Sequence, residues 1–221
     1  MLAPRKQSRI YRVLALLLTV GMAAGILSWS VLAKVDRESA IETITLKGPV
    51  DSAGSIMCPW RNPKRDISQF FPGATRIKTR LLVFSSFRNE VIERVGQGDS
   101  LGTNQVYTHT LYKGNQKVGV ILPRQIAGEY GSAEFVLALD THCRVVGFEI
   151  QRLREPNMVA SALQNPRWCA SFKGRTSSSD WKIGQDIGNV PAVARSSARR
   201  FVSAARALTI EYQVARTHGE G

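Results

Sequence analysis

The chain offers few side chains whose types and spacing could perform catalysis. Its three histidines lie far apart and form no HxxxH pair, and its three cysteines are too scattered for a zinc ribbon. No group of residues suggests a nucleophile, a paired acid and base, or a metal site. A hydrolase or transferase function has no residue support, so we expect a protein that is not an enzyme. His109 and His142 are interpreted as ordinary strand and turn residues.

Two adjacent serines near the C-terminus form the best candidate for anion binding. Ser196 and Ser197 stand beside Arg195 and Arg199. At the start of a helix, free backbone amides and arginine side chains would both favour a bound phosphate. The alternative is ordinary helix capping, in which a serine side chain accepts a hydrogen bond from the first turn.

A helix that begins at these serines is well indicated. Apolar residues follow at three- and four-residue steps, while the arginines fall largely outside that stripe. The apolar residues are Ala198, Phe201, Val202, Ala205 and Leu208. Shorter helices are expected near 89–95 and 158–164, and residues 165–174 are interpreted as loop or helix.

Two β-hairpins precede these helices. Residues 106–112 and 117–122 flank a polar turn, and residues 133–140 and 144–153 flank the tripeptide THC. Strands followed by helices predict an α+β fold with an antiparallel sheet. The region before residue 105 has a weaker pattern.

The N-terminus predicts a membrane anchor. Basic residues from Arg5 to Arg12 precede residues 13–33, which carry no charge. As a helix this segment would span about 32 Å, which matches a hydrocarbon core of roughly 30 Å. The flanking cations predict a cytoplasmic N-terminus and a periplasmic domain on the bacterial inner membrane. A signal peptide cleaved after Ala33 is the alternative, but its apolar core would usually have only about 7–15 residues.

The charge of +13 belongs mostly to the external domain, since residues 1–33 contain only four of the cations and no acid. A basic domain beside a membrane favours contact with anionic lipid or an acidic partner protein. A merely solvated basic surface remains the alternative. An external location argues against nucleic acid.

Three stretches of sequence resemble a known family. They are GEYGSAEFVLALDTHCRVVGFEIQRLREPNMVASAL, WCASFKG and NVPAVARSSARRFVSAA. Together they resemble the FMN-binding domain found in the Rnf electron-transport complex and in the sodium-translocating NADH:quinone reductase. That family has one membrane span and then an external domain, in which a threonine that opens a helix is joined to FMN through a phosphoester. The resemblance covers roughly residues 105–210.

The resemblance implies which residues correspond to the cofactor site. These positions are Tyr130, Gly131, Glu155, Pro156, Ala192, Val193, Ser196 and Ser197. The threonine position is Val193, which has no hydroxyl, and a glycine position is Pro191, which has no amide donor. Arg154 takes a histidine-like position. The resemblance therefore implies no covalent FMN, while non-covalent FMN is still possible.

Other residues have two interpretations under this resemblance. Tyr130 and Trp168 could stack on the flavin ring, but aromatic residues more often lie in a core. Glu155 could contact the flavin, or it could pair with Arg152 or Arg154.

The cysteines leave a further choice open. Cys143 and Cys169 could form a disulfide outside the cytoplasm, with Cys58 left over. The sequence does not choose among the three pairings.

These observations divide the chain into five parts. They are a cytoplasmic N-terminus (1–12), a transmembrane helix (13–33), a stalk and N-terminal elaboration (34–104), an FMN-binding-like domain (105–210) and a C-terminal tail (211–221).

The function expected from the sequence is that of a membrane-anchored accessory subunit. It would bind other subunits of a respiratory or photosynthetic electron-transfer complex, without covalent FMN. The alternative is an electron-transfer subunit that binds FMN non-covalently. A basic adaptor for anionic lipid or envelope polymer is compatible with either function.

Overall fold

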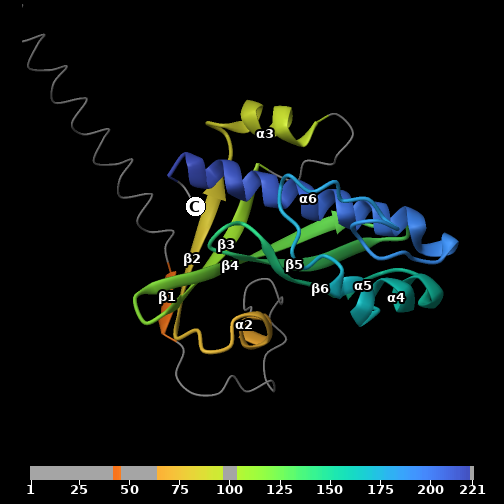
Figure 1. Cartoon of the computed structure of the whole chain (residues 1–221), viewed down its shortest axis with the longest axis horizontal. Coiled ribbons are helices and arrows are strands. Elements are labelled where there is room, and N and C mark those ends of the chain that lie inside the picture. The colour runs from red at the N-terminus through yellow and green to blue at the C-terminus, as the bar shows by residue number, and fades with distance from the viewer. Residues whose placement is uncertain (1–41, 46–63, 97–103, 220–221) are drawn as a thin grey trace, which may run out of the picture. The chain divides into compact units, whose positions relative to one another are not determined.

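The computed structural model in Figure 1 describes residues 42–45, 64–96 and 104–219. The predicted transmembrane segment, residues 13–33, lies outside the described residues, as does Cys58. Within the described ranges, no helix combines the length and the apolar character that crossing a membrane requires.

The centre of the fold is a six-stranded antiparallel sheet in which each strand pairs with the next along the chain. The strands are β1 (Glu42–Thr45), β2 (Arg76–Val83), β3 (Gln105–Lys113), β4 (Gln116–Ala127), β5 (Ser132–Asp140) and β6 (Val145–Leu153). The two predicted hairpins are confirmed as β3–β4 and β5–β6. The predicted α+β class with an antiparallel sheet is therefore confirmed.

Side chains on both faces of the sheet are buried. On β4, Val120 and Leu122 belong to a larger core, whereas Ile121 between them belongs to a smaller one. This follows from the two-residue period of a strand, which sends successive side chains to opposite faces. It explains why the central strands read as nearly continuous apolar runs.

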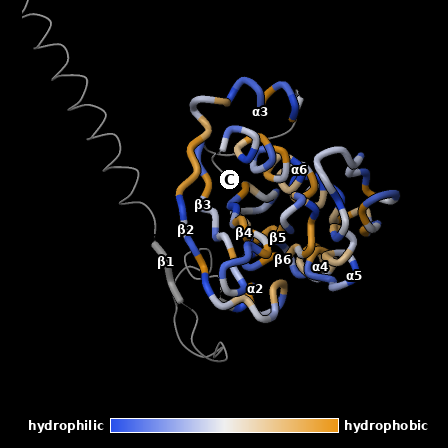
Figure 2. Tube along the Cα trace, turned by 60° about the vertical axis from the view of Figure 1, so that its left-hand side comes forward, coloured by the Kyte–Doolittle hydropathy of each residue, from blue (hydrophilic) through white to orange (hydrophobic). Residues whose placement is uncertain are grey.

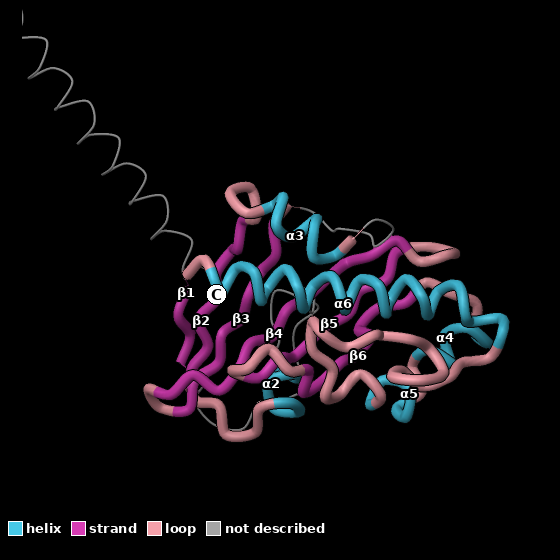
Figure 3. Tube along the Cα trace, turned by 45° about the horizontal axis from the view of Figure 1, so that its top comes forward, coloured by secondary structure: helices cyan, strands magenta, loops and turns pink. Residues whose placement is uncertain are grey.

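The long helix α6 (Arg195–Thr217) lies along one face of the sheet (Figures 1 and 3) and closes the larger core. Figure 2 shows hydrophobic residues gathering between this helix and the strands. The helix extends past residue 210, and Tyr212 and Val214 are buried in the core. Residues 211–217 are thus part of the core helix rather than a separate tail.

The predicted start of this helix needs a correction. Its N-cap is Ala194, with no side-chain capping bond, and Ser196 and Ser197 lie inside the first turn. The short 3-10 helix η2 (Ala192–Ala194) leads directly into α6 and shifts its start toward the N-terminus. The capping interpretation of the two serines is wrong for this reason.

The helix α2 (Lys64–Phe70) covers the opposite face. It approaches closely because the sheet carries glycines beneath it. A Cβ atom at Gly119 would overlap the ring of Phe71, and one at Gly147 would overlap the ring of Phe70.

Strands before residue 105 are integral to the sheet. β1 pairs with β2, and β2 pairs with β3 along its whole length. The boundary expected at residues 104 and 105 does not separate two structural units, because this pairing crosses it.

The remaining helices follow the sequence prediction. They are α3 (Arg88–Val95), α4 (Asn157–Leu163) and α5 (Pro166–Ala170). α5 places Trp168 in an aromatic cluster, where it is 3% exposed and packs edge-on against Phe172 with ring centroids 5.0 Å apart. The core interpretation of Trp168 is confirmed.

Candidate functional site: a closed junction and an open arginine groove

Three chain segments meet at the carboxylate of Glu155. One Glu155 oxygen, Oε1, accepts a hydrogen bond from the backbone amide of Glu129 and another from the hydroxyl of Ser197, each at 3.0 Å. Glu129 lies in the β4–β5 turn, Glu155 follows β6, and Ser197 lies in the first turn of α6. We call this set of three residues the Glu155 junction.

Glycines allow the turn to approach the carboxylate. A Cβ atom at Gly128 would lie 2.6 Å from Oε1 of Glu155, and one at Gly131 would lie 2.9 Å from Cβ of Arg154. The amide of Gly128 donates to the carbonyl of Gly131 at 2.7 Å and closes the turn. The small residues of the GEYG sequence are therefore explained by close contacts within the chain, with Glu155 and Arg154.

The junction places a negative charge beside the first turn of α6. The partial positive charge of a helix N-terminus stabilises an anion there. Ser197 is fully buried, and its hydroxyl already donates to Glu155. This hydroxyl is therefore engaged by the protein's own carboxylate and does not face solvent.

The expected arginine pairing of Glu155 is not formed. Glu155 bonds to Glu129 and Ser197 instead, and Arg152 lies 3.6 Å from Glu134. The antiparallel pairing of β5 and β6 places Arg152 opposite Glu134, which explains this choice.

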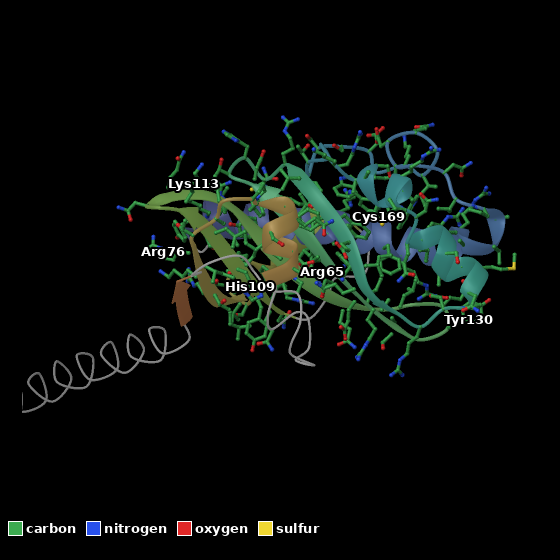
Figure 4. The ribbon with its side chains drawn as sticks, turned by 90° about the horizontal axis from the view of Figure 1, so that it is seen from below. Arg65, Arg76, His109, Lys113, Tyr130 and Cys169 are labelled. Carbon is green, nitrogen blue, oxygen red and sulfur yellow. The ribbon has the colours of Figure 1, made fainter. Side chains whose placement is uncertain are left out.

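The other residues singled out by the resemblance are exposed around the junction segments, except Gly131, which is half-buried. Ser196, Pro156 and Ala192 are exposed, and the side chain of Val193 is 48% exposed. Tyr130 is 60% exposed and lies at the end of the sheet opposite Arg76 and Lys113 (Figure 4). The fold thus brings the segments together, but among the eight residues singled out by the resemblance the hydrogen bond formed is that between Ser197 and Glu155.

A second site was not predicted from the sequence. A groove of about 1590 Å³ lies between α6, the end of β4 and the loop of residues 177–185. We call it the arginine groove. Its charged lining residues are Arg124, Asp180, Lys182, Arg195, Arg199, Arg200 and Arg206. The sequence showed the arginines outside the apolar stripe of the helix, but not the loop that faces them.

The floor of the groove contains a buried ion pair. Arg124 of β4 pairs with Glu211 of α6, and both side chains are more than nine-tenths buried. Each charge is compensated by the other, as burial requires. The floor is therefore fixed, while Arg195 and Arg199 lie exposed at one end of the helix.

The thiols do not form the suggested pair. Cys143 and Cys169 are both free, and the Sγ atom of Cys143 accepts a hydrogen bond from Arg216 at 3.1 Å. Burial raises the pKa of Cys169 to about 11, which keeps this thiol protonated near neutral pH. The suggested disulfide between these two residues is therefore not formed.

The histidine interpretation is confirmed. His109 is buried in β3, where its Nδ1 atom lies 2.9 Å from the hydroxyl of Thr79. His142 lies in the turn between β5 and β6. In the part of the chain that the structure describes, no cluster of histidine, cysteine and acidic residues could hold a metal ion.

Comparison with solved structures gives matches that include a protein named NqrC. NqrC from Shewanella oneidensis matches with a TM-score of 0.44 and 16% sequence identity, over 70% of this chain and 89% of that chain. No family model and no curated protein sequence matches the chain. At this score and identity, the likeness does not assign the chain to a family.

Proposed function

We propose that this protein is a membrane-anchored accessory subunit of a membrane electron-transfer complex. Its domain would stand on the periplasmic side and carry no covalent flavin. The uncharged segment of residues 13–33 supports the anchor. The observation that carries the proposal is Val193, at the position that corresponds to the FMN-bearing threonine in the resembled family.

The chemistry at this position supports a non-flavin role. A phosphoester needs a hydroxyl oxygen, and Val193 supplies none. Pro191 caps η2 but has no amide proton to donate to a phosphate. Glu155 adds a negative charge nearby, and its oxygen already accepts bonds from Glu129 and Ser197. Three features thus disfavour a phosphate near the start of α6.

Isolation of the full chain from its native membranes in mild detergent tests this proposal. We expect other subunits in fixed stoichiometry and an intact mass equal to that of the polypeptide alone. A chain that is freely soluble, or that is isolated without any stoichiometric partner, would contradict the accessory role.

A second candidate function is non-covalent FMN binding with electron transfer. The exposed side chain of Tyr130, on one of the segments that meet at the junction, favours it because an aromatic ring can stack on a flavin. Added FMN would then lose fluorescence on binding, and Tyr130→Ala would weaken that binding. A colourless preparation that leaves FMN fluorescence unchanged would exclude this function.

A further inference from the structure

We propose that the arginine groove is the docking site for an extended acidic segment of a partner protein, whose carboxylates pair with Arg195 and Arg199. The inference rests on the proposed function in one respect, since an accessory subunit needs a partner. It names where that partner binds and with what chemistry. It does not involve the junction: none of the eight residues singled out there by resemblance lines the groove.

The groove presents cations in a row. Arg195 and Arg199 are one helical turn apart, and Arg206 lies about 16 Å from Arg195 along the axis at about 1.5 Å per residue. An extended chain rises about 3.3 Å per residue, so roughly five residues would cover this distance. The row therefore matches a short acidic segment with several carboxylates.

The cations of the groove differ in whether they already bind other groups of the protein. Arg206 donates to the carbonyl of Val95 at 2.8 Å, and Lys182 lies 3.2 Å from Asp180. Among the residues that the structure describes, Asp180 is the one acidic residue lining the groove, and it forms no ion pair with Arg195 or Arg199. These two guanidinium groups are the natural partners for incoming carboxylates, which they can bind through two parallel hydrogen bonds.

The wall opposite α6 is held in place before any partner binds. Trp181 is buried and donates from Nε1 to the carbonyl of Thr176 at 2.8 Å. Arg175 pairs with Asp186 at 3.0 Å, and the amide of Gly184 donates to the carbonyl of Ile187 at 2.8 Å. A preformed wall lowers the entropy lost on binding.

The lining favours a protein segment over other anions. The groove volume of about 1590 Å³ exceeds the roughly 300–1000 Å³ that is typical of small-molecule sites. A site that inserts into a membrane interface would carry exposed apolar side chains beside its cations. The described large hydrophobic residues that are exposed, such as Val83 and Met158, lie outside the groove lining.

The test uses the full chain in nanodiscs of neutral lipid. The probe is a fluorescein-labelled peptide of six glutamates alternating with six serines, and its glutamine counterpart is the negative control. We expect fluorescence anisotropy to show binding of the acidic peptide alone. The Arg195→Gln/Arg199→Gln variant should bind it at least tenfold more weakly, with an unchanged melting temperature because both side chains are exposed.

A charge-matched variant separates the groove from net charge. Lys113→Gln/Arg144→Gln removes two exposed cations that do not line the groove, and it should change the affinity by less than twofold. Equal loss in both variants would overturn the inference, because it would show attraction by net charge alone. Wild-type affinity in the groove variant would also overturn it.

Vesicles of phosphatidylglycerol test the lipid alternative. We expect their binding to be equal for the two variants. A selective loss in the groove variant, without any peptide binding, would replace the acidic segment by a membrane surface and overturn the inference. If the groove variant still co-isolates its native partners, this inference fails while the proposed accessory function stands.

Discussion

At the start of α6, Ser197 turns into the protein and donates to Glu155, whereas Arg195 and Arg199 line an open groove. The Glu155 junction is closed by the protein's own anion, whereas Arg195 and Arg199 are exposed in the arginine groove and form no ion pair with Asp180, its acidic lining residue. One helix end thus serves two regions of opposite character. The difference is the basis of our proposal that an external anion binds in the groove rather than at the junction.

The largest expected effect comes from the floor of the groove. Glu211→Ala would leave Arg124 buried without its counter-charge, which should lower the free energy of unfolding by about 3–5 kcal/mol. Urea unfolding of the full chain measures this loss. Arg199→Gln is the matched control, and it should cost less than about 0.5 kcal/mol because Arg199 is exposed. Equal losses in the two variants would show that the buried ion pair and the exposed Arg199 contribute equally to stability.

The carboxyl of Asp66 in α2 provides a contrast to that of Glu155, because it is buried with little compensation. Asp66 accepts one hydrogen bond from Gln151 at 2.6 Å and is 1% exposed. Burial raises its pKa from 3.8 to about 6, although Arg65 and Gln151 act in the opposite direction. The folded state therefore favours the protonated form of Asp66.

This shift predicts a dependence of stability on pH. The contribution of protonated Asp66 is complete below pH 3.8 and is lost as the pH rises through about 6. The free energy of unfolding should fall by at most about 3 kcal/mol over that window. Asp66→Asn should remove this component, as urea unfolding between pH 4 and 8 would show. An identical pH profile in the variant would refute the assignment to Asp66.

The junction itself should show a smaller, shared effect. Glu155→Ala leaves the buried hydroxyl of Ser197 and the amide of Glu129 without their acceptor, at a cost of about 1–3 kcal/mol. Ser197→Ala should cost less, and the double variant should cost less than the two single losses together. Strictly additive losses would mean that the hydrogen bond between the two residues contributes nothing to stability.

The smallest effect is expected at Val193. Val193→Thr restores the hydroxyl at a half-exposed position, so the stability should change by less than about 0.5 kcal/mol. After co-expression with a flavin transferase, the intact mass should still lack FMN, because Pro191 and Glu155 are unchanged. A gain of one FMN would show that the hydroxyl was the one missing feature.

Local patterns in the sequence predicted much of the fold. Alternation and short polar turns located the β3–β4 and β5–β6 hairpins, and the apolar stripe of residues 198–208 located α6. The expected start of α6 was wrong, because η2 leads into the helix and makes Ala194 its N-cap. Ser197 instead bonds to Glu155, 42 residues away in the chain. A capping pattern cannot reveal such a distant partner.

The region before residue 105 and the groove show a related limit of prediction from sequence patterns. β2 alternates weakly because cationic residues such as Lys78 and Arg80 share it with buried Ile77 and Leu82. The groove brings together residues 124–127, 177–185 and 195–206, which are separate in the sequence. The arginines are visible in the sequence. The loop of residues 177–185, which faces them and forms the groove, is placed there by tertiary packing.

The most direct test of the account compares the wild-type chain with Arg195→Gln/Arg199→Gln, each isolated from native membranes in mild detergent. Subunit stoichiometry and the visible spectrum are measured on the same samples. The account predicts stoichiometric partners with the wild type, their loss with the variant, and an intact mass without FMN in both. A wild-type chain that is isolated alone with bound FMN would contradict it.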